Sequence, residues 1–452
     1  MMDTLPTAFV QQLRTLLPTE WEALVKALEG TSPASVHLHP HKFPQFTGAT
    51  EPEAEVPWNP LGRYLAQRPV FTLDPAFHAG AYYVQEASSM LIAAAFRQLF
   101  PEQRPLRVLD LCAAPGGKST LLASHLPPGS WLLANEVIRT RYQVLKYNLV
   151  KWGYGNTFTS NHDVTDFAPL AGYFDVVLVD APCSGEGLFR KDVAARAEWS
   201  PEHVAHCAAR QGRILAAAQE LVAPNGVLLY STCTYNATEN DANAATLAEQ
   251  TGWSVAPLAF PAAWELEERS IGYQAYPHRL RGEGFYLAAF RKEVGEARMT
   301  KAPKSFKKLT RISSKLSAQV QPWLAQPERL DIWATPSGRW RTLAADLRSD
   351  AQLLAQHLSR LEVGTPLGEW KGKGLVPAAE WALALDSTTE IATVDVNRAQ
   401  ALALLRKQTP DLPELGKGWH VVRYRGLQLG WVKGLGNRYN NYYPTAWRIR
   451  MQ

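Results

Sequence analysis

Apolar residues at the start of the chain recur every three or four positions and then give way to shorter alternating runs. The helical spacing extends from Phe9 to Leu28, so we predict that residues 1–30 form helices. Over residues 35–41 apolar and polar positions alternate, which predicts a strand. The following stretch, residues 44–60, is rich in Pro, Glu and Gly and is expected to form a surface loop.

Three histidines share one face of the strand predicted over residues 35–41, namely His37, His39 and His41. Histidine is a common metal ligand. Alternate positions on one strand, with a proline between two of them, form a poor tetrahedral cage, and no cysteine lies nearby. We therefore expect no metal site in this chain.

Short apolar runs alternate with helical patterns between residues 106 and 230. This alternation indicates βαβ units, so we predict an α/β fold built on a parallel sheet. The predicted strands span residues 106–112, 131–136, 156–160, 174–180 and 226–232. The predicted helices span residues 117–126, 138–152 and 203–223. A later apolar run, residues 284–290, is expected to add an antiparallel strand at the edge of the sheet.

The composition is that of a globular protein that can bury large cores. The chain has 452 residues, enough for about three domains, and is 46% hydrophobic and 20% charged. Four cysteines without a Cys-x-x-Cys spacing exclude a disulfide scaffold and a zinc ribbon. Free thiols indicate a reducing compartment, so we expect a cytoplasmic protein. The start of the chain lacks the pattern of a signal peptide, and no apolar run is long enough to span a membrane.

Positive charge gathers in the last third of the chain. Overall, 47 Lys and Arg face 42 Asp and Glu, a mild excess that suits an anionic partner. Six cations crowd the stretch after Lys292, namely Lys301, Lys304, Lys307, Lys308, Arg311 and Lys315. This stretch is expected to be a basic linker or an exposed helix. Two roles are equally compatible with it: a solvated surface without a ligand, or a contact with phosphate groups.

The carboxyl-terminal stretch from Gly416 to Gln452 combines cations with aromatic rings. It holds seven Lys or Arg and no Asp or Glu. The interleaved aromatic residues are Trp419, Tyr424, Trp431, Tyr439, Tyr442, Tyr443 and Trp447. Such a composition suits RNA, because guanidinium groups and rings stack on unpaired bases. A small β-domain with an aromatic core has a partly similar composition, but the absence of acidic residues favours nucleic acid.

Two cysteines follow runs that are predicted to be strands. Cys183 stands in Asp-Ala-Pro-Cys-Ser-Gly-Glu-Gly, after the strand at 174–180. Cys233 stands in Ser-Thr-Cys-Thr-Tyr, after the strand at 226–232. The carboxyl ends of parallel strands are where α/β enzymes place their sites, so the pattern predicts covalent catalysis through cysteine. The alternative is that both thiols are small buried residues. The proline before Cys183 and the Ser-Gly after it argue against that alternative.

A Gly-rich loop, Leu109–Lys118, follows the first predicted strand of the sheet and matches neither the dinucleotide fingerprint nor the Walker A motif. Glu136 ends the next strand and is placed to bind the ribose hydroxyls, while Asp163 follows the third strand and is placed near an adenine amino group. Carboxylates without a phosphate-binding consensus predict a nucleoside cofactor that lacks phosphates, namely S-adenosyl-L-methionine. The residues expected to bind it are Cys112, Ala113, Ala114, Pro115, Gly116, Gly117, Lys118, Glu136, Arg141, Asp163 and Asp180.

These motifs resemble those of the NOL1/NOP2/Sun family of RNA cytosine-5 methyltransferases. The matching segments, in family order, are Cys112–Lys118, Asp180–Gly187, Ser231–Asn240 and Pro277–Phe285. Gly80–Ser89 resembles the pre-catalytic module of the family. Gly430–Pro444 resembles the carboxyl-terminal PUA-like module of the bacterial RsmF type, which methylates small-subunit ribosomal RNA. The family usually has Arg-x-Asn where this chain has His37-Leu-His39, so different RNA contacts are expected there.

The resemblance implies a Rossmann-like methyltransferase sheet with a small amino-terminal α+β module and a carboxyl-terminal PUA-like, β-rich RNA-binding domain. It implies a pre-catalytic module over residues 1–105 and an S-adenosylmethionine-dependent methyltransferase domain over 106–292. A basic linker with an intermediate module is expected over 293–375, and the PUA-like domain over 376–452.

The resemblance also implies roles for the site residues. Cys233 is the thiol that adds to C6 of cytosine, and Cys183 acts in breaking the adduct. DNA cytosine-5 enzymes use a Pro-Cys nucleophile instead, so from the residues alone the two roles are interchangeable. Asp180 is expected to stay protonated and to donate to cytosine N3, which requires a carboxyl pKa raised by burial. Lys118 is expected to favour a nearby thiolate, and Cys112 and Cys207 are expected to be packed residues.

The function implied is cytosine-5 methylation of 16S ribosomal RNA by a monomeric enzyme through a covalent cysteine–C6 adduct. Its substrate is either naked ribosomal RNA or the assembled 30S particle. A tRNA cytosine-5 methyltransferase is an alternative, as is a non-catalytic RNA-binding ribosome assembly factor with the same fold. The presence of both strand-end thiols, Lys118 and the three cofactor carboxylates favours an active enzyme.

Overall fold

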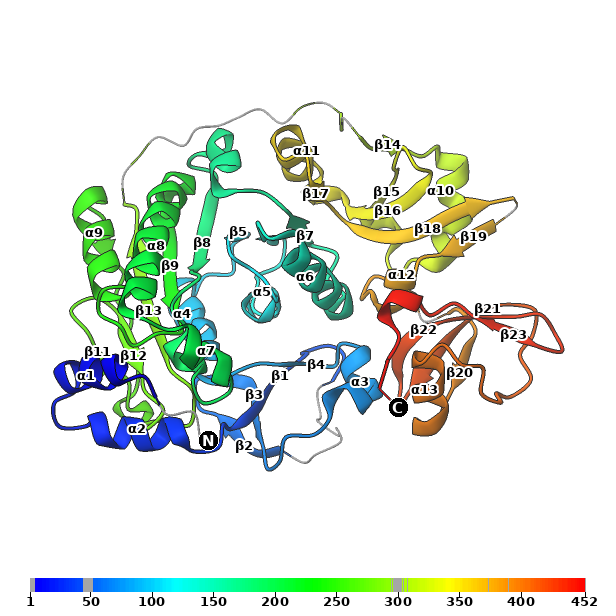
Figure 1. Ribbon diagram of the computed structural model, residues 1–452. Helices are drawn as coiled ribbons and strands as arrows, with labels where there is room; N and C mark the ends of the chain where they lie inside the picture. The colour runs from blue at the N-terminus through cyan, green and yellow to red at the C-terminus, as the bar shows by residue number, and fades with distance from the viewer. Residues whose placement is uncertain are drawn as a thin grey trace.

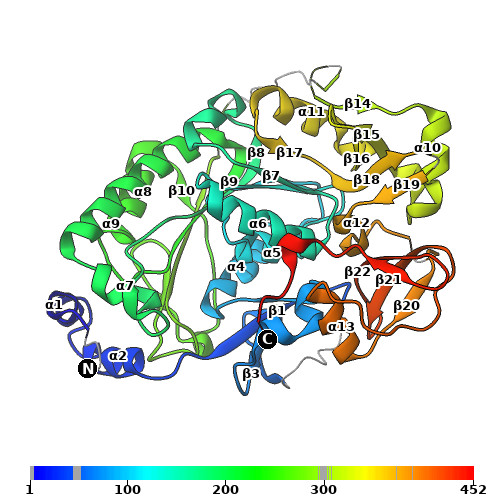
Figure 2. The same cartoon turned by 45° about the vertical axis from the view of Figure 1, so that its right-hand side comes forward.

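The chain forms four β-sheets with helices packed around them (Figures 1 and 2). The computed structural model describes residues 5–43, 52–293, 295, 303, 305–306, 308–372, 374–388 and 390–451. The two helices predicted at the start are present as α1 (Thr7–Leu16) and α2 (Trp21–Glu29). Their apolar faces pack against Phe189, Trp199 and Tyr235 from the loops of the largest sheet.

An antiparallel sheet with the strand order β2-β3-β1-β4 follows the two helices. Its strands are β1 (Ala34–Leu38), β2 (Pro52–Val56), β3 (Asn59–Leu65) and β4 (Tyr82–Val84). The strand predicted over 35–41 is confirmed as β1. The loop predicted over 44–60 is wrong from Pro52 onward, because β2 and β3 form a hairpin there; residues 44–51 lie outside the described part. The Pro and Glu side chains that favoured a loop lie on β2, which is an exposed edge strand.

The histidines of this sheet are packed inside the protein. His37 lies in β1 and His39 just after it, and both side chains are fully buried, whereas His41 is exposed. Burial lowers the pKa of His37 well below its usual range and that of His39 to about 2, so both rings are neutral. His39 Nε2 lies 3.0 Å from the carbonyl of Trp152. These rings therefore join the small sheet to the domain that follows it.

The central sheet has ten strands in the order β11-β12-β13-β9-β8-β5-β6-β7-β17, with β10 paired to β13. Its parallel strands are β5 (Arg107–Asp110), β6 (Trp131–Asn135), β7 (Thr157–Ser160), β8 (Phe174–Asp180) and β9 (Val222–Thr232). The other strands are β10 (Ser254–Val255), β11 (Glu267–Glu268), β12 (Tyr273–Ala275), β13 (Phe285–Arg291) and β17 (Leu361–Glu362). All five parallel strands predicted from the sequence are confirmed.

The strand predicted over 284–290 is β13, and it pairs antiparallel with β9 as expected. The predicted edge position is wrong, because β12 pairs with the other side of β13 and β11 extends the sheet beyond it. These two strands are only three and two residues long. Strands that short leave no readable alternation in the sequence.

Helices cover both faces of the central sheet. They are α4 (Leu91–Leu99), α5 (Gly117–Ala123), α6 (Arg139–Trp152), α8 (Pro201–Leu221) and α9 (Asp241–Thr251). Helix α3 (Pro75–His78) packs instead against β4 and the carboxyl-terminal sheet, and α7 (Val193–Glu198) follows the Cys183 loop. Alternate strand residues point to opposite faces. Leu109 and Val177 share a core with α8 on one face, while Val108 and Val176 share a core with α4 and α5 on the other. The long helix α8 begins at Pro201, because the Ser200 hydroxyl caps it by accepting from the His203 amide.

The last third of the chain contains the two remaining sheets. The first is antiparallel, with β14 (Thr310–Arg311), β15 (Leu330–Ala334), β16 (Arg339–Ala344), β18 (Thr365–Lys371) and β19 (Gly374–Pro377). The second has β20 (Thr393–Asp395), β21 (Gly418–Tyr424), β22 (Leu427–Gly434) and β23 (Tyr439–Asn441). The helices here are α10 (Ser314–Val320), α11 (Arg348–His357), α12 (Ala379–Leu383) and α13 (Arg398–Leu405).

The aromatic residues of the last sheet divide into core and surface. Trp431, Tyr424 and Tyr443 are buried in three separate hydrophobic clusters, so these rings are not available to stack on a base. Tyr442 is exposed. Of the six crowded cations, Lys301, Lys304 and Lys307 lie outside the described residues, and the other three are exposed. Arg311 among these pairs with Asp331 at 2.6 Å.

Contacts from distant segments fasten these parts together. Strand β17 pairs with β7, and the Asp350 carboxylate accepts from the indole N–H of Trp131 at 3.0 Å. Lys42 Nζ donates to the carbonyls of Ala79, Lys151 and Leu383, at 3.1, 2.5 and 2.8 Å. One buried ammonium therefore joins the small sheet, the central domain and the carboxyl-terminal part.

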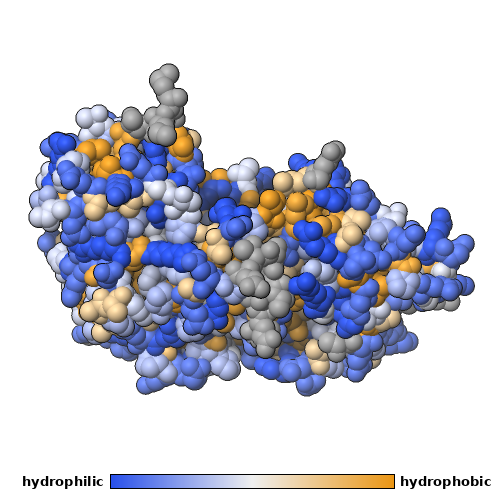
Figure 3. Space-filling model, turned by 90° about the horizontal axis from the view of Figure 1, so that it is seen from below, coloured by the Kyte–Doolittle hydropathy of each residue, from blue (hydrophilic) through white to orange (hydrophobic). Residues whose placement is uncertain are grey.

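The outer surface is mixed in character. The face shown in Figure 3 is largely hydrophilic, with apolar side chains in separate groups. Among the described helices, none has both the length and the apolar character needed to cross a membrane.

Candidate active site

A cavity of about 500 Å³ opens at the carboxyl edge of the parallel strands. The loops after β5, β6, β8 and β9 line it, together with residues 83–86 from the small amino-terminal sheet and the loop that follows it. Of the predicted site residues, all but Gly116 and Asp163 line this cavity. The lining residues among them are Cys112, Ala113, Ala114, Pro115, Gly117, Lys118, Glu136, Arg141, Asp180, Cys183 and Cys233. The parallel pairing of β5, β6, β8 and β9 thus brings together side chains that are far apart in the sequence.

The two strand-end thiols face each other inside this cavity. Cys183 Sγ lies 3.1 Å from Cys233 Sγ, and both cysteines are free and partly buried. The hydrogen bond with Cys233, followed by burial, raises the pKa of Cys183 well above its usual value. Cys183 therefore keeps its proton in this contact, while either sulfur can act as the donor.

Short contacts between the two cysteine loops hold the thiols at this separation. The Gly187 amide donates to the Cys233 carbonyl at 2.7 Å, and the hydroxyls of Ser184 and Thr234 lie 3.1 Å apart. A Cβ atom at Gly187 would lie 2.6 Å from the Cys233 carbonyl oxygen. Only glycine therefore fits at this position, which explains the Ser-Gly-Glu-Gly sequence after Cys183.

A partly buried ion pair lies beside the thiols. Lys118 Nζ is 2.7 Å from Asp180 Oδ2, and Asp180 Oδ1 accepts from the Ser231 hydroxyl at 2.9 Å. Burial lowers the pKa of Lys118, but the Asp180 carboxylate outweighs this effect and the net shift is upward. Lys118 is therefore a cation next to the thiol pair. Both Asp180 oxygens accept hydrogen bonds here, so a donor role toward a base requires one of these contacts to break.

Hydrogen bonds with neighbouring residues fix the conformation of the Gly-rich loop. The Ala113 amide donates to the Asn135 carbonyl at 2.8 Å, and Arg141 Nη2 donates to the Ala114 carbonyl at 2.7 Å. Gly116 adopts a φ of 110°, which lies in the left-handed region that favours glycine. The loop backbone consequently forms the floor of the cavity, where a ligand can approach closely.

Carboxylates follow the ends of successive strands, as predicted. Glu136 is almost fully buried; it accepts from the Ile138 amide at 2.8 Å and pairs with Arg141 at 3.4 Å. Asp110, which the sequence analysis missed, is fully buried at the end of β5 and lines the cavity. Its Oδ2 accepts from the Ser119 hydroxyl at 2.6 Å, whereas Oδ1 has no partner. The sequence feature that points to Asp110 is its position as a polar residue at the end of an otherwise apolar strand.

Two predicted residues lie apart from the cavity wall. Asp163 is exposed, and its Oδ1 accepts from the amide and hydroxyl of Thr165 at 3.0 and 2.7 Å, so it caps the following turn. Gly116 lies behind the loop, where a Cβ atom would be 3.2 Å from a methyl group of Leu145. Cys207 is packed in α8, as expected. Cys112 lines the cavity wall, and burial raises its pKa.

Several cavity residues carry no sequence motif that points to them. They are Lys191 after the Cys183 loop, and Arg210 and Ile214 in α8. Tyr83 in β4 and Gln85 and Glu86 after it also line the cavity, and they belong to the Gly80–Ser89 segment that resembles the family's pre-catalytic module. Gly117 packs against Tyr83, because a Cβ atom there would lie 3.2 Å from the ring. These residues reach the cavity only through tertiary packing.

Comparison with known proteins gives three family matches along the chain. Residues 98–291 match the family described as 16S rRNA methyltransferase RsmB/F. Residues 5–87 match the N-terminal domain of 16S rRNA methyltransferase RsmF, and residues 392–449 match the methyltransferase RsmF PUA domain.

Individual relatives match over most of their length. Ribosomal RNA small subunit methyltransferase F of Erwinia tasmaniensis is 31% identical over 470 residues, covering 97% of this chain and 96% of that protein. The protein of the same name from Aeromonas salmonicida is 33% identical over 403 residues, covering 86% of this chain and 84% of that protein.

Solved structures from Pyrococcus horikoshii share the fold. A methyltransferase homolog protein has a TM-score of 0.54 at 24% identity, covering 64% of this chain and 95% of that one. NSun6 with SFG has a TM-score of 0.51 at 19% identity, covering 65% of this chain and 100% of that one. At these identities the likeness shows the fold alone, an α/β methyltransferase sheet.

Proposed function

The chain belongs to the RsmB/F family of 16S rRNA methyltransferases, as a member of the RsmF type, and from that premise we propose that its thiol pair methylates C5 of a cytosine through a covalent adduct. The family resemblance predicted from the motifs is thereby confirmed. The proposal rests on the 3.1 Å contact between Cys183 and Cys233 beside the partly buried Lys118. The predicted domain limits, the monomeric state and the choice between naked RNA and the 30S particle remain parts of this proposal.

The cavity fits S-adenosylmethionine as the cofactor. It combines an open Gly-rich loop, the buried Glu136 after β6 and the unpartnered Asp110 Oδ1. Glu136 matches ribose hydroxyls, and a carboxylate oxygen without a donor suits an ammonium group. Once bound, the cofactor supplies an electrophilic methyl group. Asp163 remains a proposed contact of the adenine amino group.

The first step assigned to this chain is the addition of Cys233 to cytosine C6. Cytosine C5 is a poor nucleophile until a sulfur atom bonds to C6 and makes the ring enamine-like. The cationic Lys118 favours the Cys233 thiolate and stabilises negative charge that develops beside it. Asp180 lies on the same wall, where it interacts with the polar edge of the base after exchanging one of its present contacts.

The second step is release, and it belongs to Cys183. The largest cause of the raised Cys183 pKa is its hydrogen bond with Cys233. When the Cys233 sulfur is bonded to carbon it becomes a weak acceptor, so Cys183 then releases its proton to solvent water more readily. The Cys183 thiolate takes the C5 proton, the bond between Cys233 and C6 breaks, and the methylated base is freed.

A methyl-transfer assay tests this proposal. Labelled S-adenosylmethionine is incubated with the full chain and, separately, with naked small-subunit rRNA, 30S particles and tRNA. Label in C5 of a cytosine of the small-subunit RNA is the expected result, and it is lost in Cys233→Ala. Label in tRNA alone would establish the tRNA alternative. RNA binding without any transfer would establish the assembly-factor alternative.

A further inference from the structure

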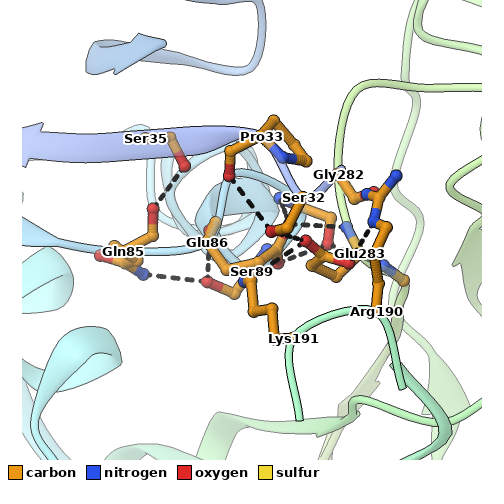
Figure 4. A network of polar contacts seen from close by, with 12 residues as sticks. Ser32, Pro33, Ser35, Gln85, Glu86, Ser89, Arg190, Lys191, Gly282 and Glu283 are labelled. Atoms are coloured by element: carbon orange, nitrogen blue, oxygen red, sulfur yellow. Dashed lines mark hydrogen bonds and ion pairs between the residues drawn. The ribbon is translucent and has the colours of Figure 1, made fainter. Parts of the chain in front are cut away.

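Two neighbouring cations after the Cys183 loop differ sharply in their contacts. Arg190 is nearly buried, and its guanidinium donates to Glu283 Oε2 at 2.8 Å and to the Gly282 carbonyl at 2.5 Å. Lys191 has a side chain that is 29% exposed, and its Nζ lies 3.6 Å from Glu283 Oε1. Figure 4 shows the two cations on either side of this carboxylate. A separation of 3.6 Å is an ionic contact but too long for a hydrogen bond.

Glu283 has little capacity left for Lys191. Its Oε1 already accepts from the Ser32 hydroxyl, and its backbone amide donates to Glu86 Oε1 at 2.9 Å. Its carbonyl accepts from the Tyr235 hydroxyl on the Cys233 loop. The carboxylate is therefore fixed between the two cysteine loops and the amino-terminal module. Because Arg190 and Ser32 already donate to the two Glu283 oxygens, Lys191 keeps only an ionic contact with this carboxylate and no hydrogen bond.

Lys191 brings its ammonium group to the catalytic cavity. It lines the same cavity as Cys183 and Cys233. Of the three other cations of the wall, Lys118 pairs with Asp180 at 2.7 Å and Arg141 donates to the Ala114 carbonyl at 2.7 Å, while Arg210 lies on α8. Lys191 differs from Lys118 and Arg141 because its ammonium makes no hydrogen bond within the described residues that satisfies the usual distance limit.

The chemistry of the reaction places an anion near this position. A base that bonds to the Cys233 sulfur must leave its stack and enter the cavity. Its ribose and phosphate remain joined to the strand, so the phosphodiester lies at the cavity mouth. Phosphate contacts are the usual task of exposed Lys and Arg in RNA-binding proteins, and they position the strand without reading its sequence.

We propose that Lys191 binds the phosphodiester of the target nucleotide at the mouth of the catalytic cavity, and that Glu283 holds Lys191 in place through their ionic contact. This inference rests on the proposed function, because it takes RNA as the substrate. In this proposal Arg190 stabilises the fold through its hydrogen bonds to Glu283 and Gly282, whereas its neighbour Lys191 contacts the substrate.

The salt dependence of RNA binding by the full chain tests this assignment. A fragment of small-subunit rRNA is titrated at several salt concentrations, and the logarithm of the association constant is plotted against that of salt. One lost phosphate contact on single-stranded RNA lowers the slope by about 0.7. We expect this loss in Lys191→Met and Lys191→Gln and a retained slope in Lys191→Arg. Cofactor affinity, measured by calorimetry, is expected to stay unchanged in all three.

Arg104→Met is the matched control. Arg104 is 46% exposed and pairs with Asp175 at 3.1 Å, near the amino ends of β5 and β8 and thus at the opposite edge of the sheet. Its loss removes one cation far from the cavity, so the slope is expected to stay at the wild-type value.

An unchanged slope in Lys191→Gln, or an equal loss in Arg104→Met, would overturn the assignment. So would a loss of cofactor binding in the folded Lys191→Gln protein, because that outcome makes Lys191 a structural residue. If the wild-type chain binds RNA but transfers no methyl group, the proposed function fails while the slope still decides the role of Lys191.

Discussion

Cys183 Sγ and Cys233 Sγ lie 3.1 Å apart although 50 residues separate them in the chain. The parallel register of β8 and β9 produces this contact, because it pairs Asp180 with Ser231 just before the two cysteines. The hydrogen bond between the thiols makes them unequal, because one sulfur donates and the other accepts. Their roles can therefore differ even though their positions at the two strand ends are nearly equivalent.

Replacing Cys233 by alanine is expected to abolish the reaction. The variant lacks the sulfur that bonds to C6, so turnover falls by at least about 10³-fold, in line with the loss of other catalytic nucleophiles. No RNA should remain attached to the protein on a denaturing gel. Cofactor binding measured by calorimetry serves as the control for folding. Methylation at the wild-type rate would refute the assignment.

Replacing Cys183 by alanine is expected to trap the adduct. Addition through Cys233 still proceeds, but the group that takes the C5 proton is missing, so a protein–RNA species should accumulate that survives denaturation. The double variant with Cys233→Ala should show no such species, which identifies the attached sulfur. If instead Cys233→Ala traps RNA and Cys183→Ala does not, the two roles are reversed.

Asp110 is expected to make the stability of the protein depend on pH. Burial raises the pKa of this carboxyl from 3.8 to about 7. Between these values the folded state binds more protons than the unfolded state. The free energy of unfolding therefore falls as the pH rises from about 4 to 7, by up to about 1.4 kcal/mol per pH unit.

Denaturant unfolding from pH 4 to pH 8 checks this dependence. Asp110→Asn removes the titrating group and should flatten the curve relative to wild type over that range. Asp346→Asn is the control, because Asp346 is exposed, and it should leave the curve unchanged. An equal slope in Asp110→Asn and wild type would show that other groups cause the pH dependence.

Replacing Lys42 by methionine is expected to destabilise the folded chain by about 2 kcal/mol or more. Burial lowers the pKa of Lys42 to about 7, yet its three carbonyl acceptors match the three N–H groups of an ammonium. Methionine preserves most of the volume but leaves buried carbonyls without this donor, at about 1–3 kcal/mol for each that stays unsatisfied.

Chemical denaturation of the full chain measures this change. The exposed Lys315→Met serves as the control and should lie within about 0.5 kcal/mol of wild type. A value for Lys42→Met within the same range would mean that the three carbonyls find other partners, and that Lys42 does not join the three parts of the chain.

The sequence alone determined the parallel core of the sheet, the Gly-rich loop and both strand-end thiols. These features depend on near neighbours in the chain. An apolar run such as Phe174–Asp180 is buried on both faces wherever it pairs, and a loop that directly follows a strand must end at the carboxyl edge. The spacing of the motifs also sufficed to identify the family.

Only the tertiary structure decided those features that depend on contacts between segments far apart in the sequence. The hairpin at β2 and β3 forms although its composition favours a loop, because Val56 and Trp58 are buried against α4. Strand β13 is internal because a short strand pairs with its far side. Lys191 belongs to no motif that the sequence analysis identified. It faces the catalytic cavity because Glu283, 92 residues further along the chain, lies beside it after folding, and no local pattern records such a contact.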